Sequence, residues 1–398
     1  MLNPHSPKTA NWILPLIVFS QFLCTSLWFA GNTVIPDLNK QFHFESQQLG
    51  HLLSAVQFGF ISGTLIYALF GISDRLQPTK VFFLSATLAS FSNLSIVLFD
   101  HGIQGILLFR YFTGFFLAGI YPVGMKIASD HYGKVLGKAL GFLVGALVIG
   151  TALPHLIKSF SGGFLWKSVF ILTSFFSFAG GSLMLAVPEG PYRITAKTLM
   201  PTNLITNFHN KDFREASFGY FGHMWELYAF WAFVPLMLSL WADRHPNEII
   251  NVHLFSFFII GGGSLACVWS GYQSLIIGTR KMALYALSLS CLCCLASPLI
   301  FAFPFPIFII FLVIWGFAVI ADSPMFSTLV AQHAPIQGKG TALTFITCIG
   351  FSITILSIEL ISVLKKVIPS NYLFVFLALG PALGIIAMVS KKKNKPEK

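Results

Sequence analysis

The chain has 398 residues, of which 55% are hydrophobic and only 10% are Asp, Glu, Lys or Arg. Soluble domains carry roughly 25% charged residues, so the composition excludes a soluble protein and indicates a polytopic membrane protein. The formal net charge of +11 requires no nucleic-acid partner if the basic residues gather on one membrane face.

Segments of about 20 mostly apolar residues follow one another along the chain, which is the length that a transmembrane helix needs. The first is too long for the core of a signal peptide. The longest polar interruption, at 188–213, follows the sixth segment and divides the chain into two sets of six. The predicted spans are 12–34, 50–70, 80–99, 103–125, 136–156, 165–187, 214–240, 253–273, 282–302, 305–330, 341–362 and 371–390.

This pattern predicts an all-α membrane protein with 12 transmembrane helices in two pseudo-symmetric six-helix halves. We expect an N-terminal half at 1–187, a cytoplasmic central loop at 188–213, a C-terminal half at 214–390 and a basic cytoplasmic tail at 391–398. The six cysteines all fall inside apolar runs, where cysteine behaves as a small hydrophobe. We therefore expect no disulfide framework, no bound metal and no cofactor.

The distribution of Lys and Arg orients the spans, because these residues concentrate in cytoplasmic loops. With both termini inside, the inside segments hold 18 Lys and Arg and the outside segments hold 6. We therefore expect both termini to be cytoplasmic and the protein to lie as a monomer in a bacterial cytoplasmic membrane, the cell inner membrane. Anionic lipids of the inner leaflet are the expected partners of the basic loops, and no nucleic acid is expected.

Two short patterns repeat at an offset of 202 residues, close to half of the chain. Gly114 is followed eight positions later by Pro122, and Gly316 is followed at the same spacing by Pro324. Such an internal repeat is typical of membrane proteins built from two parallel halves. At the same offset Arg110 aligns with Leu312 and Ile120 aligns with Asp322. The unmatched charges are therefore more informative about function than the shared glycines and prolines.

Twelve spans in two halves, a basic central loop and inside termini resemble the major facilitator superfamily. The loop Gly71-Ile72-Ser73-Asp74-Arg75 with Lys80 is similar to that family's glycine, Asp-Arg and basic motif, with Gln77 in place of its second glycine. The resemblance implies a secondary transporter in which Asp74, Arg75 and Lys80 act as a gating loop. Their contacts would form in one conformation and break in the other.

Three titratable residues inside the spans are candidates for coupling transport to protons. Inserting a charged side chain near the centre of a span into the membrane costs about 2.5–3.5 kcal/mol, so such a residue is expected to have a functional or structural role. Glu226 lies midway along span seven, and His223 precedes it by three residues on the same helix face. Asp322 lies in span ten, two residues before Pro324. Each carboxyl could instead be a structural group that is hydrogen-bonded to neighbouring helices.

A second set of residues predicts a polar, partly aromatic cavity for a substrate. In span one, polar and aromatic residues recur at spacings of 4, 3 and 4, which defines one helix face. Helix–helix hydrogen bonds are the alternative explanation. Arg110 in span four could hold an anionic group of the solute, pair with a carboxyl, or extend to the outer surface. Glu359, near the outer end of span eleven, is expected to be interfacial. The cavity candidates are Arg110, Gln21, Thr25, Trp28, Asn32, Gln57, Tyr121 and Trp225.

These features together predict a secondary active transporter for a small polar or zwitterionic organic solute, coupled to protons as a symporter or antiporter. One proton that moves down 100 mV releases about 2.3 kcal/mol, enough for a solute gradient of roughly 50-fold. A divalent-metal or metal-chelate (siderophore) transporter is the alternative, with His223, Glu226 and Asp322 as ligands. A non-transporting membrane receptor is a third possibility. An enzyme is not expected, because no nucleophile and base pair is evident.

Overall fold

The computed structural model describes residues 10–42, 46–99, 102–132, 136–160, 166–193, 208–334 and 339–390, and every regular element in these ranges is a helix. The helices of the first half of the sequence are α1 (Ile13–Thr25), α2 (Ala30–Thr33), α3 (Ile35–Phe42), α4 (Ser46–Leu69), α5 (Ile72–Arg75), α6 (Pro78–Leu98), α7 (Ile103–Leu117), α8 (Tyr121–His131), α9 (Leu136–Phe160) and α10 (Lys167–Met184). The second half contributes α12 (Lys211–Arg244), α13 (Val252–Ile277), α14 (Thr279–Ile300), α15 (Phe305–Ala321), α16 (Ser323–His333), α17 (Lys339–Leu364), the 3₁₀ segment η2 (Ser370–Ala378) and α18 (Leu379–Val389).

Within the described residues, 10 segments are helical, long and apolar enough to cross a membrane. Two shorter apolar helices, Ile13–Thr25 and Ser54–Leu69, lie where the first two spans are predicted. The predicted all-α membrane architecture is confirmed, and the predicted count of twelve is reached when these two shorter helices are included. The first span is interrupted, because α1 ends at Thr25 and α2 begins only at Ala30.

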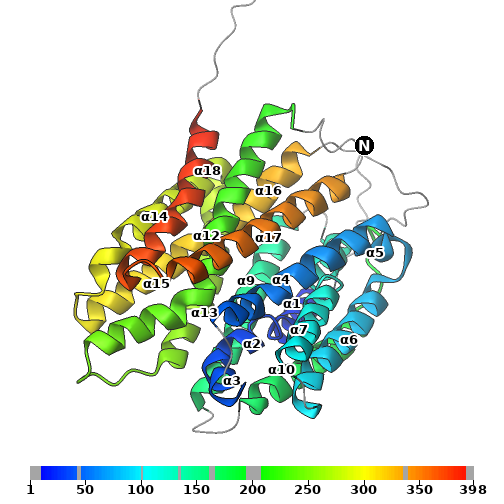
Figure 1. Cartoon of the computed structure of the whole chain (residues 1–398). Helices are drawn as coiled ribbons and strands as arrows, with labels where there is room; N and C mark the ends of the chain where they lie inside the picture. Colours follow the sequence, from blue (N-terminus) through cyan, green and yellow to red (C-terminus); the bar gives the residue numbers. More distant parts are fainter. Residues whose placement is uncertain are drawn as a thin grey trace, which may run out of the picture.

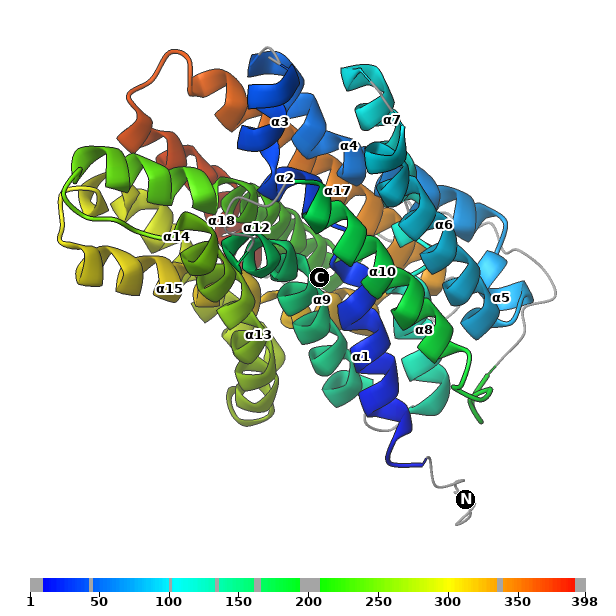
Figure 2. The ribbon, with the colours of Figure 1, turned by 90° about the horizontal axis from the view of Figure 1, so that it is seen from below.

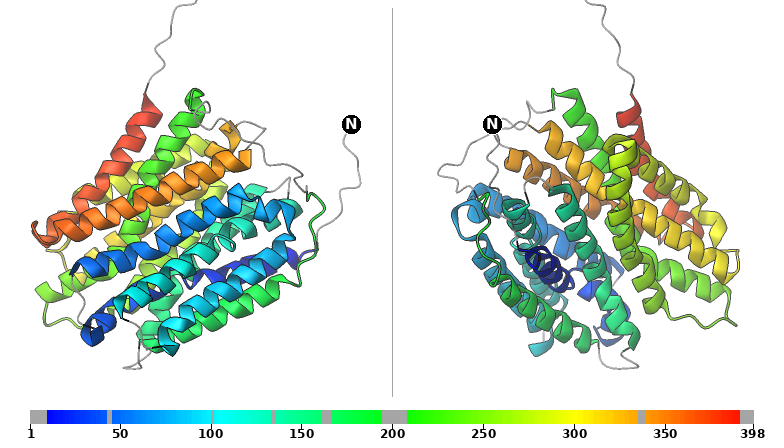
Figure 3. Two further views of the ribbon diagram at one scale, coloured as in Figure 1. Left: turned by 45° about the vertical axis from the view of Figure 1, so that its right-hand side comes forward. Right: turned by 180° about the vertical axis from the view of Figure 1, so that it is seen from behind.

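The helices gather in two groups that follow the order of the sequence. Figure 1 shows α1 to α10 in blue to green-cyan on one side and α12 to α18 in green to red on the other. The two groups meet along α4 and α17, and along α9 and α13. The same separation is visible from below in Figure 2 and from two further directions in Figure 3. We refer to residues 10–193 and 208–390 as the first and second helix groups.

Spans four and ten are each broken just before a proline. In the first group α7 ends at Leu117 and α8 begins at Tyr121, with Pro122 in its first turn. In the second group α15 ends at Ala321 and α16 begins at Ser323, with Pro324 in its first turn. Proline lacks the N–H that would continue the helix, and its ring clashes with the preceding turn, so each helix restarts at this point.

The repeated glycines permit two equivalent helix contacts. A Cβ atom at Gly114 of α7 would lie 2.0 Å from the Val56 carbonyl oxygen of α4, and one at Gly316 of α15 would lie 2.6 Å from the Ile259 carbonyl oxygen of α13. Only glycine allows the backbones to approach this closely. The sequence repeat therefore corresponds to a repeat in packing.

Charged side chains tie helices together at the end of the bundle that is predicted to be cytoplasmic, which we call the basic end. Arg280 of α14 bonds to the Glu215 carboxylate of α12 and donates to the Met388 carbonyl of α18 at 2.5 Å. In the first group, Arg193 bonds to Glu189 and donates to the carbonyl of Leu76 at 3.0 Å. Each of these contacts stays within one helix group.

Candidate functional site

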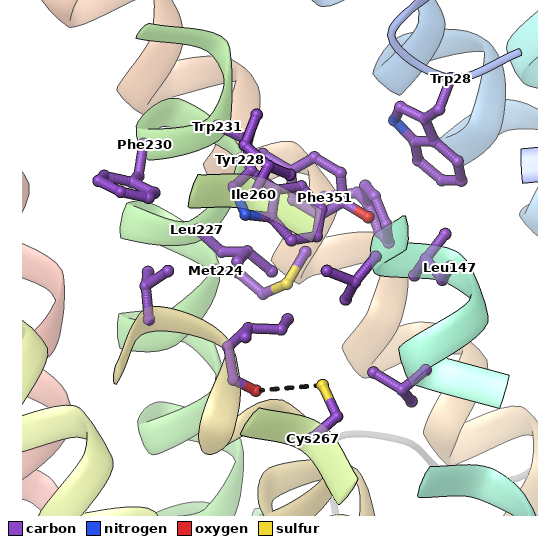
Figure 4. Close-up of a cluster of buried hydrophobic side chains, with 14 of the residues drawn as sticks. Trp28, Leu147, Met224, Leu227, Tyr228, Phe230, Trp231, Ile260, Cys267 and Phe351 are labelled. Atoms are coloured by element: carbon purple, nitrogen blue, oxygen red, sulfur yellow. Dashed lines mark hydrogen bonds between the residues drawn. The ribbon is translucent and has the colours of Figure 1, made fainter. Parts of the chain in front are cut away.

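The two helix groups meet at a cluster of aromatic rings. Trp28, in the break between α1 and α2, lies 4.9 Å from Phe60 of α4, 5.7 Å from Tyr228 of α12 and 5.6 Å from Phe351 of α17, as ring-centroid distances. Trp231 of α12 adds to this cluster through Tyr228 at 5.2 Å. Figure 4 shows Trp28 across from Tyr228 and Phe351. We call Trp28, Phe60, Tyr228, Trp231 and Phe351 the aromatic seam.

Polar atoms of the seam and of its neighbour Gln57 are buried without a hydrogen-bond partner. They are the indole Nε1 of Trp28, the indole Nε1 of Trp231 and the Oε1 of Gln57. Gln57 is one helical turn before Phe60 and one turn after Ser54, which contacts α17, so it lies on the α4 face toward the second group. Buried donors and acceptors normally find partners, and those left without one need an explanation. A bound solute would supply partners at this place.

Arg110 does not face the seam. Its guanidinium is buried and donates from Nη1 to the Leu27 carbonyl at 3.1 Å, from Nη2 to the Trp28 carbonyl at 2.6 Å, and from Nη1 to Asn93 Oδ1 at 3.1 Å. A Cβ at Gly31 would lie 2.8 Å from Arg110 Nε, so this position accommodates no larger residue. Arg110 therefore holds the carbonyls that the break in span one exposes, inside the first group.

The predicted polar stripe of span one divides between two environments. Thr25 donates to backbone carbonyls, including that of Ala146 in α9 at 3.4 Å, so it joins helices of the first group. Gln21 is also buried within this group, since a Cβ at Gly124 of α8 would lie 2.2 Å from its Oε1. Asn32 is partly exposed in α2. Of the stripe, only Trp28 belongs to the aromatic seam.

Two further residues predicted to line the cavity, Tyr121 and Trp225, lie in different environments. Tyr121, the first residue of α8, lies near enough to Cys267 of α13 and to Tyr228 for electrostatic interaction, so it faces the second group. Trp225 instead donates from Nε1 to the Phe376 carbonyl at 3.1 Å and packs against Gly380. Trp225 therefore points into the second group, away from the seam.

Glu226 lies inside the second group and accepts hydrogen bonds from three donors. Trp315 Nε1 donates to its Oε1 at 2.6 Å, Ser290 Oγ donates to its Oε2 at 2.8 Å, and Cys294 Sγ donates to its Oε1 at 3.2 Å. These donors come from α14 and α15. A buried carboxylate with this many donors has its negative charge well compensated, as a structural carboxylate requires.

His223 and Asp322 form a buried pair in the same group. His223 Nδ1 lies 2.8 Å from Asp322 Oδ1, and both side chains are about 1% exposed. The other atoms of the pair, His223 Nε2 and Asp322 Oδ2, have no hydrogen-bond partner. Asp322 occupies the break between α15 and α16. The pair therefore places two titratable side chains in contact within the protein interior.

The predicted gating loop forms the short helix α5 and the start of α6. Gly71 precedes α5 with φ of +58°, a left-handed conformation that favours glycine. Arg75 and Lys80 are exposed. The side chain of Asp74 lies outside the described residues, as do residues 194–207 of the predicted central loop and the predicted tail 391–398.

Two contacts between the helix groups were not expected from the sequence. Ser54 Oγ of α4 donates to Glu359 Oε1 of α17 at 2.9 Å, so Glu359 bridges the groups at the end opposite the basic end. At the same end the rings of His155 in α9 and His253 in α13 stack at 6.0 Å between centroids. His155 is only 1% exposed, although it lies near the end of α9. Both contacts join residues remote in sequence, which helical periodicity cannot pair.

Comparisons with known proteins agree with this architecture. The family model described as Major Facilitator Superfamily matches residues 17–357. No curated protein matches the sequence significantly. Among solved structures, a mutant of the nucleoside transporter NupG is similar with a TM-score of 0.72 and 14% identity, over 94% of this chain and 98% of that one.

Two further solved structures are similar at comparable coverage. The inward open xylose transporter XylE from E. coli gives a TM-score of 0.74 at 13% identity, over 96% of this chain and 97% of that one. A bacterial homolog of the human lysosomal transporter Spinster, inward-facing and unoccupied, gives 0.65 at 15% identity, over 96% and 94%. At these identities the likeness concerns the fold alone.

Proposed function

Because the chain belongs to the major facilitator superfamily, it is a multi-pass membrane transporter and not an enzyme, and we propose that it moves a small polar organic solute by proton-coupled alternating access. In this mechanism the two helix groups rock about a central site that opens to each side in turn. The observation that supports the central site is the aromatic seam, where buried polar atoms without partners lie between the groups.

The proton is assigned to the pair of His223 and Asp322. The pair is buried, its two members are in contact at 2.8 Å, and one further nitrogen and one further oxygen are free of partners. Adding a proton changes the charge of the pair, and a buried charge is costly enough to bias two conformations against each other. Asp322 also lies at a helix break, where a change in charge acts on the junction of α15 and α16.

Glu226 takes a structural role in this proposal. Its three hydrogen-bond donors hold α12, α14 and α15 together, and each would lose its acceptor if the carboxylate left. The metal-transport alternative receives less support, because no group of three or more His, Cys, Asp and Glu side chains comes together as a metal site within the described ranges.

The test uses proteoliposomes with an imposed proton gradient and a radiolabelled solute selected by a thermal-shift screen of the purified protein. Asp322→Asn is expected to abolish accumulation above the equilibrium level while exchange of solute across the membrane continues. Glu248→Gln, in an exposed loop, is the matched carboxyl-to-amide control and is expected to behave as wild type. Full uphill transport by Asp322→Asn would refute the assignment of the proton to this pair.

A further inference from the structure

In the described part of the spans, the buried charged side chains make their polar contacts inside their own helix group. Arg110 donates to carbonyls and to Asn93 of the first group. In the second group Glu226 accepts from three donors, and Asp322 is in contact with His223. Across the described residues of the spans, these charges therefore face inward and not toward the seam between the groups.

This arrangement restricts the charge of the solute. An ionised group that enters a buried site loses its hydration, and this loss is tolerable only if a counter-charge and hydrogen bonds replace the water. The seam and its neighbour Gln57 provide aromatic rings, the hydroxyl of Tyr228, two unpartnered indole N–H groups and one unpartnered amide oxygen. A carboxylate, phosphate or ammonium group would find no counter-charge there.

The same side chains describe what the solute must present. The Nε1 atoms of Trp28 and Trp231 require acceptors, such as a hydroxyl, carbonyl or ring nitrogen, and Gln57 Oε1 requires a donor. The tilted rings of Trp28, Tyr228 and Phe351 favour a flat or apolar face of the solute.

We infer that the cargo is an uncharged solute with a ring or other apolar face and both hydrogen-bond acceptors and donors, held by Trp28, Trp231 and Gln57. This inference rests on the proposed transport function and narrows its cargo from polar solutes in general to neutral ones. Because the cargo has no charge, the charge moved in each cycle equals that of the coupled protons alone, and transport generates a current.

The inference is tested with a panel of matched neutral and ionised probes. The pairs are nicotinamide and nicotinate, uridine and uridine 5′-monophosphate, and glucose and glucuronate, extended to a solute library balanced between neutral and charged members. Stabilisation of the purified full-length protein against heat reports binding. Neutral members are expected to bind, and their ionised counterparts are expected to bind at least tenfold more weakly.

Two variants connect the binding to the seam. Trp28→Phe keeps a ring and removes the indole N–H, so binding of a neutral probe is expected to weaken roughly fivefold, the effect of one net hydrogen bond. Trp269→Phe, at an exposed position of α13, is the matched control and should bind as wild type. Equal binding by Trp28→Phe and wild type would overturn the assignment of the N–H to the solute.

A measurement of the charge moved during transport tests the neutral-cargo inference and the proton-coupling proposal independently. On a solid-supported membrane, a neutral probe added under a proton gradient should produce a current in the wild type and none in Asp322→Asn. If neutral probes bind but Asp322→Asn still accumulates them, the neutral-cargo inference stands and the coupling assignment fails. If the library hits are predominantly ionised, the neutral-cargo inference fails whatever the coupling result.

Discussion

Ile120 and Asp322 occupy the same position in two broken helices. Each is the residue immediately before the second helix segment, α8 or α16, and each precedes a proline by two residues. The first group therefore has an apolar side chain at the break where the second has a carboxylate in contact with His223. The helix break is the same in both groups, but only the second group has a titratable side chain, Asp322, at this position.

Arg110 is predicted to be a structural residue of the first group. Arg110→Gln removes the fork that binds the Leu27 and Trp28 carbonyls and leaves Asn93 with one acceptor unused. The loss of buried hydrogen bonds is expected to lower stability by about 2–3 kcal/mol, and Arg110→Lys should rescue it only in part because an ammonium lacks the planar fork. Thermal unfolding in detergent measures the effect. Unchanged stability with a selective loss of solute binding would instead place Arg110 in the cavity.

Gly114 is predicted to be essential for the contact between α4 and α7. Gly114→Ala places a Cβ within 2.0 Å of the Val56 carbonyl oxygen, so the two helices must separate. Overpacking of this kind costs about 1–3 kcal/mol, and the melting temperature should fall accordingly. Gly271→Ala is the control, because a Cβ there has no neighbour within 4 Å. Equal melting temperatures for the two variants would show that α4 and α7 adjust freely.

Glu359 is predicted to favour the conformation in which the end opposite the basic end is closed. Glu359→Ala removes the acceptor of Ser54 Oγ, a partly exposed contact between the groups. After allowance for solvent screening this contact contributes about 1 kcal/mol, which corresponds to a shift of roughly fivefold toward the open form.

The reporter for this shift is Gln57→Cys, a position that is 1% exposed in this structure. Its reaction with a membrane-impermeant maleimide should accelerate about fivefold when Glu359→Ala is added. The parent chain is labelled in parallel and its rate is subtracted, because its buried Cys348 also lies between α17 and α4. A labelling rate that does not respond to Glu359→Ala would contradict the bridging role.

Acid is predicted to open the same end through His155 and His253. Their rings stack across the two groups, beside the ion pair of Lys158 and Asp37 at 2.9 Å. Protonating both rings places two like charges in contact, so the closed form is favoured when they are neutral and loses stability as the pH falls below about 6. Acid also lowers the thiolate fraction, so each rate is divided by that of a fully exposed cysteine at the same pH. This relative labelling rate of Gln57→Cys should be higher at about pH 5 than at about pH 7.5. His253→Phe keeps the stacking and removes the contact between two like charges, so it should reduce this pH dependence, while the buried ring of His155 retains the remainder.

The sequence predicted the scaffold better than the site. Apolar length located the spans, and the repeat of Gly114 and Gly316 indicated two equivalent contacts, which the structure places against Val56 and Ile259. The break in span one was not predicted, because the segment between Thr25 and Ala30 contains no proline or glycine. Its cause is tertiary, since Arg110 from α7 binds the exposed carbonyls.

The direction of each polar side chain was the least predictable feature. Helical spacing places Gln21, Thr25 and Trp28 on one stripe, yet only Trp28 reaches the second group. Periodicity identifies a helix face but not the neighbouring helix that this face meets. The contact between Ser54 and Glu359 joins residues 305 positions apart, so it depends on how the two groups dock.

Arg280 has a consequence for the route by which a solute leaves at the basic end. This one side chain joins α14 to α12 through Glu215 and to α18 through the Met388 carbonyl. A molecule that passed between these three helices would break the contact of Arg280 with the buried Glu215 carboxylate and leave that carboxylate with Lys211 alone. We therefore expect the exit route to run along the boundary between the two groups, where its width depends on their relative tilt and not on the loosening of either group.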